Sequence, residues 1–192
     1  MPLRYSTASA RAAGRARNRA DSAMEALACG RYLPYVKTQR IYLDTSVIGG
    51  CFDPEFAPWS KGLLRDFREG TFVPVVSELV AAEIAPAPDV VQGVYAELLE
   101  LGAELLVLSG QAESLAVRYL ERDVIPARFE ADALHIAVAT VAEVDLLVSW
   151  NFRHIVRFDR IRMFNSVNRE AGYKEIEIYS PREVTLHEEA RN

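Results

Sequence analysis

From residue 40 onward, short runs of apolar residues alternate with longer segments in which apolar residues recur every three or four positions. The runs predict buried strands, and the longer spacing predicts helices. We expect strands at residues 40–43, 72–76, 104–108 and 145–150, and helices at residues 59–69, 78–85, 89–101, 111–122 and 127–143. Because strand and helix alternate, we expect an α/β fold, a three-layer α/β/α sandwich with a central parallel sheet of four to five strands.

The first predicted strand ends on Asp44, which is followed by Thr45, Ser46 and then a predicted loop at residues 49–54. In open α/β sheets, ligands bind outside the carboxyl ends of the strands, so Asp44 is the first candidate site residue. All three residue types also cap helices by accepting hydrogen bonds from free backbone N–H groups. The sequence leaves both interpretations of Asp44 open.

The predicted helix at residues 127–143 is apolar on nearly every side and should be buried, with Asp132 as the exception. A buried carboxylate needs a cation, a metal or several hydrogen-bond donors, because leaving it unpaired costs several kcal/mol. We interpret Asp132 as a second functional acid; the alternative is a structural carboxylate satisfied by protein donors. His135, one turn further on, is expected to be a packed histidine behind the site.

The carboxyl end of the fourth predicted strand presents Ser149, Trp150 and Asn151. Beyond it lies a local group of basic side chains at Arg153, His154, Arg157, Arg160 and Arg162. Positive charge beside a carboxylate cluster can receive a polyanion. An ordinary solvated helix is the alternative.

The chain has 192 residues, half of them apolar, and a net charge of −5. Residues 1–40 carry eight basic and two acidic side chains, so the net charge of the remainder is −11. We expect a basic, partly disordered N-terminal extension at 1–39, one domain at 40–186 and a tail at 187–192. The two cysteines suggest neither a disulfide framework nor a zinc site. No apolar run approaches the roughly 18 residues that a membrane span needs, so we expect a cytoplasmic protein.

Four segments in order along the chain resemble a PIN domain, and more narrowly the VapC-like toxins of bacterial toxin–antitoxin modules. They are Tyr42-Leu43-Asp44-Thr45-Ser46-Val47, Val76-Ser77-Glu78-Leu79-Val80-Ala81-Ala82-Glu83, Asp132-Ala133-Leu134-His135-Ile136-Ala137 and Leu146-Leu147-Val148-Ser149-Trp150-Asn151. The segments at 161–168 and 177–184 resemble one branch of the same family. The resemblance covers roughly residues 40–184 and implies that the domain at 40–186 is PIN-like.

The resemblance implies a Mg²⁺- or Mn²⁺-dependent endoribonuclease with a cognate antitoxin partner and a homodimeric state. Asp44 matches the first acid of the family, Glu83 the acid on a helix and Asp132 the third, while Asn151 stands where many members have another aspartate. Asp44 and Asp132 would bind the metal directly, and Glu83 would bind it through water or orient the nucleophile. These four residues are the candidate catalytic set, and Ser46, Ser149 and Arg153 are the candidate substrate-binding residues.

Asn151 removes a formal charge from the site and keeps a second function open, a catalytically impaired PIN scaffold that binds RNA or a protein. Phosphatases of the haloacid dehalogenase type also begin with a strand ending on aspartate, but they need a second aspartate where Ser46 stands. Glu78, the rival of Glu83, is better explained as a first-turn acid favoured by the helix dipole. Asp145 begins its strand at the opposite edge of the sheet, so we expect it to be structural.

Overall fold

A computed structural model of the chain describes residues 37–187, so the predicted N-terminal extension and most of the predicted tail lie outside the described residues. Five strands form one sheet in the order β3-β2-β1-β4-β5, and every neighbouring pair is parallel. The strands are β1 (Arg40–Leu43), β2 (Val73–Ser77), β3 (Glu104–Leu106), β4 (Leu146–Val148) and β5 (Ile178–Tyr179). The predicted parallel sheet of four to five strands is therefore confirmed.

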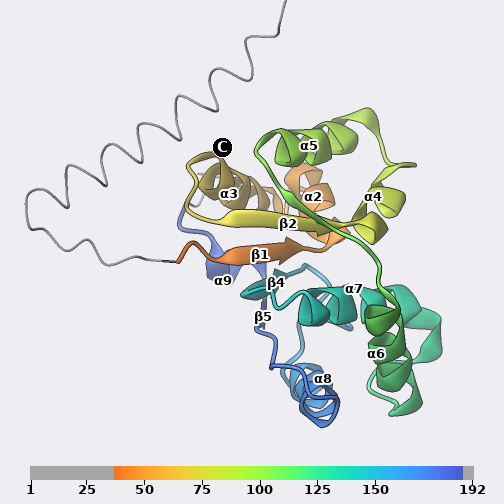
Figure 1. Cartoon of the computed structure of the whole chain (residues 1–192). Helices are drawn as coiled ribbons and strands as arrows, with labels where there is room; N and C mark the ends of the chain where they lie inside the picture. Colours follow the sequence, from red (N-terminus) through yellow and green to blue (C-terminus); the bar gives the residue numbers. More distant parts are fainter. Residues whose placement is uncertain (1–36, 188–192) are drawn as a thin grey trace, which may run out of the picture. The chain divides into compact units, whose positions relative to one another are not determined.

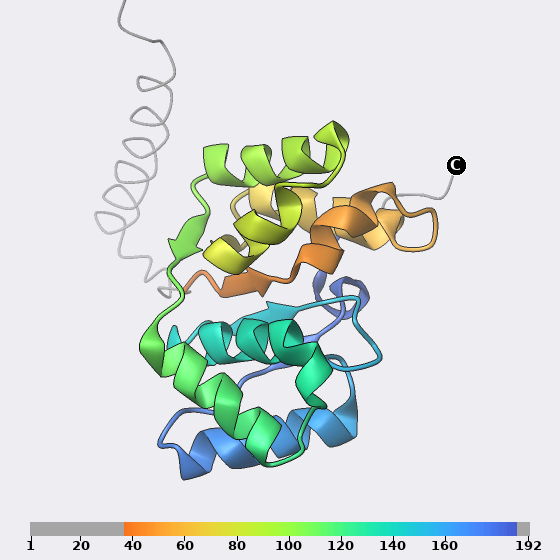
Figure 2. The same ribbon diagram turned by 90° about the vertical axis from the view of Figure 1, so that its right-hand side faces the viewer.

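Helices cover both faces of this sheet, which confirms the predicted three-layer α/β/α architecture (Figures 1 and 2). One face carries α2 (Thr45–Gly49), α3 (Ala57–Arg68), α4 (Glu78–Ile84) and α5 (Asp89–Glu100), and the other carries α6 (Gly110–Glu121), α7 (Glu130–Val141) and α8 (Phe158–Glu170). The short helix α9 (Pro181–Val184) follows β5 and lies against α3. No helix among residues 37–187 is both long enough and apolar enough to cross a bilayer.

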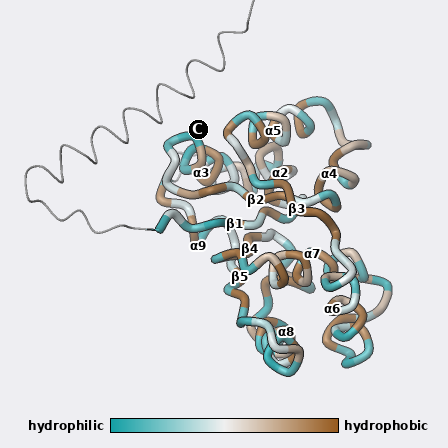
Figure 3. Tube along the Cα trace, in the orientation of Figure 1, coloured by the Kyte–Doolittle hydropathy of each residue, from teal (hydrophilic) through white to brown (hydrophobic). Residues whose placement is uncertain are grey.

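The strands form the centre of the hydrophobic core because both of their faces are covered. Ile41, Tyr42 and Leu43 of β1 are buried, as are Val75 and Val76 of β2. Strands buried on two sides have continuous apolar sequences rather than alternating ones, which explains why the short runs were recognisable. Figure 3 shows the same contrast in the helices, with hydrophobic residues along the central α7 and hydrophilic ones along much of the outer helix α8.

The main departure from the predicted elements lies at residues 49–54, where Gly50 is closely packed. The residues predicted as a loop at 49–54 form the end of α2 and a 3₁₀ turn at Gly50–Phe52. A Cβ atom on Gly50 would lie 2.6 Å from Ser60 Oγ and 2.8 Å from Trp150 Nε1. Gly50 therefore indicates close packing against Ser60 of α3 and against Trp150 rather than a loop, whereas a Cβ atom on Gly49 would have no neighbour within 4 Å.

The C-terminal segment of the described chain is attached to α3 through a buried carboxylate. Asp66 is fully buried and accepts hydrogen bonds from Thr185 Oγ1 at 2.8 Å and from the backbone N–H of Leu186 at 3.0 Å. Its second oxygen lies 2.6 Å from His187 Nδ1. On the same helix, Gly62 leaves room for the backbone of His187. These contacts hold residues 185–187 against the body of the domain.

Register brings the carboxyl ends of β1 and β4 together. The backbone N–H of Asp44 donates to the carbonyl of Val148 at 3.1 Å, so the residues that follow β4 lie beside the end of β1. At the other end of the same strands, Arg40 N donates to Asp145 Oδ2 at 2.8 Å, which confirms the predicted structural role of Asp145. Helix α4 begins at Ser77, whose Oγ accepts from Val80 N and caps it as predicted.

Candidate metal centre

A cleft of about 480 Å³ opens where β1 ends. One part of its wall is formed by the end of β1, by α2 with the turn that follows it, and by the loop that precedes α3. The other part is formed by α4, α7 and the segment after β4. The lining residues are Asp44, Thr45, Ser46, Gly49, Gly50, Asp53, Phe56, Glu83, Asp132, His135, Trp150 and Asn151. The four candidate catalytic residues from the sequence therefore all line one cleft.

Asp44 is buried, and two hydroxyl groups fix the orientation of its carboxylate. It occupies the N-cap position of α2, but its side chain makes no capping hydrogen bond. Instead, Oδ2 accepts hydrogen bonds from Ser46 Oγ at 2.6 Å and Ser149 Oγ at 2.5 Å. Oδ1 is the oxygen that faces His135, with its nearest ring nitrogen 3.9 Å away. The two serines predicted to bind substrate thus act on Asp44 in this structure.

Glu83 reaches the same place from α4. Its Oε2 atom accepts a hydrogen bond from Thr45 Oγ1 and lies 3.2 Å from His135 Nε2. The hydrogen bond to His135 lowers the pKa of Glu83, with Thr45 adding to the effect, and these contacts outweigh partial burial, which acts in the opposite direction. Glu83 is therefore a charged carboxylate held from two sides.

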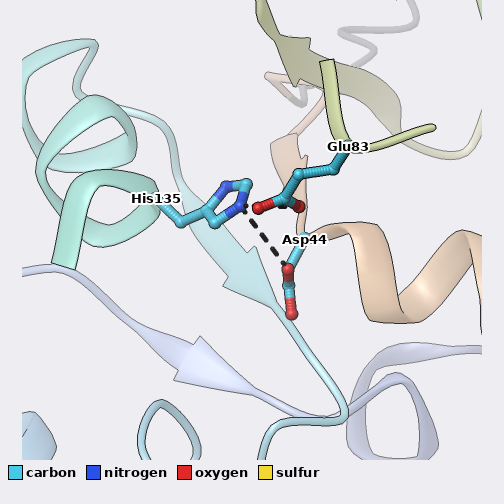
Figure 4. Close-up of side chains that lie close together, drawn as sticks. All are labelled: Asp44, Glu83 and His135. Carbon is cyan, nitrogen blue, oxygen red and sulfur yellow. Dashed lines mark hydrogen bonds and ion pairs between the residues drawn. The ribbon is translucent and has the colours of Figure 1, made fainter. Parts of the chain in front are cut away.

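His135 is almost fully buried on α7, and both of its ring nitrogens have contacts. Nε2 faces the carboxylates of Asp44 and Glu83, as Figure 4 shows, while Nδ1 lies 2.7 Å from Tyr42 Oη. Tyr42 Oη in turn lies 2.7 Å from Ser77 Oγ, so a buried hydrogen-bonded chain runs from the α4 cap to the cleft. Burial disfavours the charged imidazole, but the hydrogen bond to Glu83 and the nearby negative charges outweigh it and raise the pKa of His135.

The sequence interpretation placed His135 behind the site, whereas the structure brings Nε2 into the cleft. The available signal was its spacing, because residues at i and i+3 share a helix face and His135 is three residues after Asp132. Periodicity alone could not distinguish it from a packed histidine, since the contact that orients the ring comes from Tyr42 on a strand 93 residues earlier.

Asp132 lies half-buried on the α7 wall of the cleft, where Asn151 contacts it. Burial raises the pKa of Asp132, the charge of Asp44 adds to the rise, and a hydrogen bond from the Asn151 side chain opposes it. Asn151 Oδ1 accepts from the backbone N–H of His154 at 3.0 Å. The amide oxygen is thereby used outside the cleft, and the NH₂ group is the part that faces Asp132.

Arg153 does not line the cleft. Its side chain is exposed, and its guanidinium carbon lies 6.0 Å from the centre of the Phe129 ring. Arg157 pairs with Asp159 at 2.7 Å, and Arg162 lies over the ring of Phe158. The predicted basic cluster thus lies on the segment that follows the cleft, and none of its members lines the cleft. Arg153, Arg157 and Arg162 are exposed, Arg160 is half-buried and His154 is buried.

Among residues 37–187, the groups whose ligand atoms lie together closely enough for a metal ion are Asp44, Glu83 and His135. One donor atom from each lies within 4.8 Å of the others. Ligands of one ion with bonds of about 2.0–2.2 Å are about 3 Å apart at right angles and about 3.3 Å apart in a tetrahedron. The separations of 3.2 Å and 3.9 Å from His135 Nε2 approach these values. The residues present therefore fit one divalent cation with small adjustments.

No model of a protein family matches the sequence, and no curated protein matches it. Among solved structures, the chain is similar to a chain in the crystal structure of VapBC2 from Rickettsia felis bound to a DNA fragment from their promoter. The two are 12% identical, the match covers 74% of this chain and 98% of the other, and the TM-score is 0.47. A likeness of this degree assigns neither a family nor a function.

Proposed function

We propose that this chain is a metal-dependent endoribonuclease of the PIN/VapC type, which hydrolyses RNA phosphodiester bonds with a Mg²⁺ or Mn²⁺ ion held by carboxylates. The observation that carries the proposal is the meeting of Asp44, Glu83 and His135 donor atoms within 4.8 Å in an open cleft. Asp132 and Asn151 stand in the same cleft. Clustered acids at the carboxyl edge of a parallel sheet suit a hard cation and a phosphate substrate.

The protein's own residues prepare the site in defined ways. Ser46 and Ser149 fix the Asp44 carboxylate through Oδ2, so that Oδ1 faces the cleft. Thr45 holds Glu83, whose partly exposed carboxylate is placed to bind the metal or orient the attacking water. A bound divalent cation supplies a water of lowered pKa and stabilises negative charge on the phosphoryl oxygens. Asp132 adds a further carboxylate to the lining of the cleft, and its hydrogen bond with the Asn151 side chain orients that carboxylate.

RNA is the substrate class that we propose, and the exposed arginines after β4 supply the attraction for it. An acidic cleft alone repels a polyanion, whereas a neighbouring positive surface raises the local concentration of one. We assign Arg153 to contact with the RNA backbone outside the cleft. Ser46 and Ser149 act on substrate indirectly, by orienting Asp44.

Cleavage of an RNA pool by the purified, untagged chain tests the proposal. We expect products only with Mg²⁺ or Mn²⁺, none with a chelator, and none for Asp44→Asn even with metal. Glu130→Gln is the matched control, because Glu130 is an exposed acid on α7 that does not line the cleft. Equal cleavage by wild type and Asp44→Asn would reveal a contaminating nuclease and remove the support for the proposal.

A second candidate is a catalytically impaired PIN scaffold that binds RNA or a protein. The observation in its favour is Asn151, which offers an amide N–H where a further carboxylate would strengthen metal binding. RNA retention without cleavage, at metal concentrations that saturate the protein, would support this candidate over the nuclease.

The proposed partners are a cognate antitoxin protein and a second copy of the chain. Both follow from the sequence resemblance to VapC-like toxins. Sedimentation of the purified protein tests the homodimer, and inhibition of RNA cleavage by the product of an adjacent small open reading frame tests the antitoxin.

A further inference from the structure

We propose that His135 is itself a ligand of the metal ion in this cleft, and that the site therefore selects a first-row transition cation over Mg²⁺. The inference rests on the metal site of the proposed function but not on RNA as the substrate. Its starting point is that the imidazole and two carboxylates, not three carboxylates, have donor atoms within reach of one ion.

The position of the imidazole is the first support. His135 Nε2 lies 3.2 Å from Glu83 Oε2 and 3.9 Å from Asp44 Oδ1, and Figure 4 shows the ring pointing toward both carboxylates. Nε2 thus faces two oxygens that are both acceptors. Such an arrangement is favourable only when a shared proton or a cation lies between the nitrogen and the oxygens. A cation bound by all three groups satisfies Nε2 and both carboxylates at once.

The other ring nitrogen supplies the second support. A metal-binding histidine commonly donates its remaining N–H to a neighbouring group, which fixes the tautomer and the ring plane. Here Nδ1 lies 2.7 Å from Tyr42 Oη, and Tyr42 Oη lies 2.7 Å from Ser77 Oγ. All three side chains are buried. An Nδ1–H donated to Tyr42, with the tyrosine hydroxyl donating to Ser77, leaves the Nε2 lone pair directed into the cleft.

The side-chain oxygen of Asn151, another possible metal ligand, is used outside the cleft. Asn151 Oδ1 accepts a hydrogen bond from His154 N, and the side chain of Asn151 hydrogen-bonds to Asp132. Asn151 therefore offers its N–H group, not its oxygen, to the cleft. Asp132 lines the same cleft, but among the described residues the donor atoms that lie within 4.8 Å of one another belong to Asp44, Glu83 and His135. The third donor in that group is therefore a nitrogen atom.

Metal selectivity follows from the donor set. Mg²⁺ demands oxygen ligands in near-ideal octahedral geometry and keeps several waters. Imidazole favours the transition cations, whose affinity rises from Mn²⁺ toward Cu²⁺. His135 is almost fully buried and held by Tyr42, so the ring cannot leave the site to make room for water. The site is thus built to favour cations such as Mn²⁺ or Co²⁺ even where Mg²⁺ is more abundant.

Pulsed electron paramagnetic resonance of Mn²⁺ bound to the untagged full chain tests the inference directly. We expect nuclear modulation from a coordinated ¹⁴N in wild type and its loss in His135→Gln. His187→Gln is the matched control, because His187 lies on the C-terminal segment bound to Asp66 and does not line the cleft. Bound Mn²⁺ without nitrogen modulation in wild type would overturn the inference, whatever the stability of any variant.

Competition titrations provide a second readout. The preference for Mn²⁺ over Mg²⁺ should fall at least about 10-fold in His135→Gln, while Tyr42→Phe should keep the nitrogen modulation but weaken Mn²⁺ binding by about 10- to 100-fold. An unchanged preference in His135→Gln would count against the imidazole as ligand. RNA cleavage, measured in parallel, separates the two proposals. Nitrogen ligation without cleavage would reject the nuclease function but keep His135 as a metal ligand. Cleavage without nitrogen ligation would reject His135 as a metal ligand but keep the nuclease function.

Discussion

Gly62 lies where the C-terminal segment passes over α3, and its replacement by alanine should destabilise the domain. A Cβ atom at this position would lie 1.7 Å from the carbonyl oxygen of His187 and 2.8 Å from Thr185 Oγ1. The first distance is far below any possible contact and involves backbone. Gly62→Ala therefore requires residues 185–187 to move away from α3, which breaks their hydrogen bonds to the buried Asp66.

The expected magnitude is the balance of two effects. Alanine is better than glycine inside a helix by about 1 kcal/mol, which stabilises the variant. Hydrogen bonds to a charged group contribute about 1.5–3 kcal/mol each, and three contacts to Asp66 are affected. Because water can solvate Asp66 once the segment leaves, we count the loss as about 3–4 kcal/mol rather than the full sum. The net destabilisation expected for Gly62→Ala is therefore about 2–3 kcal/mol.

Gly93 provides the matched control. It lies inside α5, and a Cβ atom there would have no neighbour within 4 Å. Gly93→Ala should therefore stabilise the protein by about 0.5–1 kcal/mol through helix propensity alone. Urea unfolding followed by circular dichroism gives both values, and hydrogen exchange of the C-terminal peptide reports whether the segment is released. If Gly62→Ala stabilises the protein as much as Gly93→Ala does, residues 185–187 are not attached to α3 as described.

Three further predictions concern the cleft. Saturating Mn²⁺, at about 100 times its dissociation constant, should raise the free energy of unfolding by about 2.7 kcal/mol, and Asp44→Asn should remove most of the accompanying rise in melting temperature. Because burial raises the pKa of Asp132 in the folded state, its ionisation opposes folding at neutral pH, so Asp132→Asn should stabilise the metal-free protein by about 0.5–2 kcal/mol at pH 7. That gain should shrink as the pH falls through the raised pKa of folded Asp132 and should be smallest below about 4, where the carboxyl group is protonated in both states. An equal gain at pH 7 and below pH 4 in urea unfolding would refute this cause. Asn151→Asp should destabilise the metal-free protein by about 1 kcal/mol, because a second carboxylate replaces the group that donates a hydrogen bond to Asp132. The same variant should bind Mn²⁺ more tightly in calorimetry, because added ligand charge raises affinity.

The fold could be predicted from the sequence wherever the local pattern of an element was uniform. Strands β1 and β2 are buried on both faces and so have continuous apolar runs, and Ser77 marks the start of α4 by its capping chemistry. Strand β5 has only two residues, and it exists because β4 offers backbone partners at Leu147 and Val148. Such a strand is defined by tertiary pairing, which no local pattern contains.

The candidate site was partly readable for a similar reason. Asp44 and Asn151 follow strands, so their positions at one edge of the sheet could be inferred, and both line the cleft. The direction in which the Asn151 amide points depends on His154 N, and the role of His135 depends on Tyr42. The first contact is local, since His154 is only three residues after Asn151, and Asn side chains often accept from nearby backbone N–H groups in such turns. The second joins residues 93 positions apart, whose relative position is set by packing, so sequence spacing could not predict it.

The central place of β1 in the sheet has a consequence for how the protein folds during its synthesis. Asp44 leaves the ribosome early, but Ser149, which fixes its carboxylate, lies 105 residues further along the chain. At about 5–20 residues per second, translation of that interval takes roughly 5–20 s, during which the nascent chain has acids but no assembled cleft. Under the proposed function, the cleft would therefore be assembled only after translation has passed β4. A product terminated before β4 would lack Ser149 and Asn151 and so could not form this cleft.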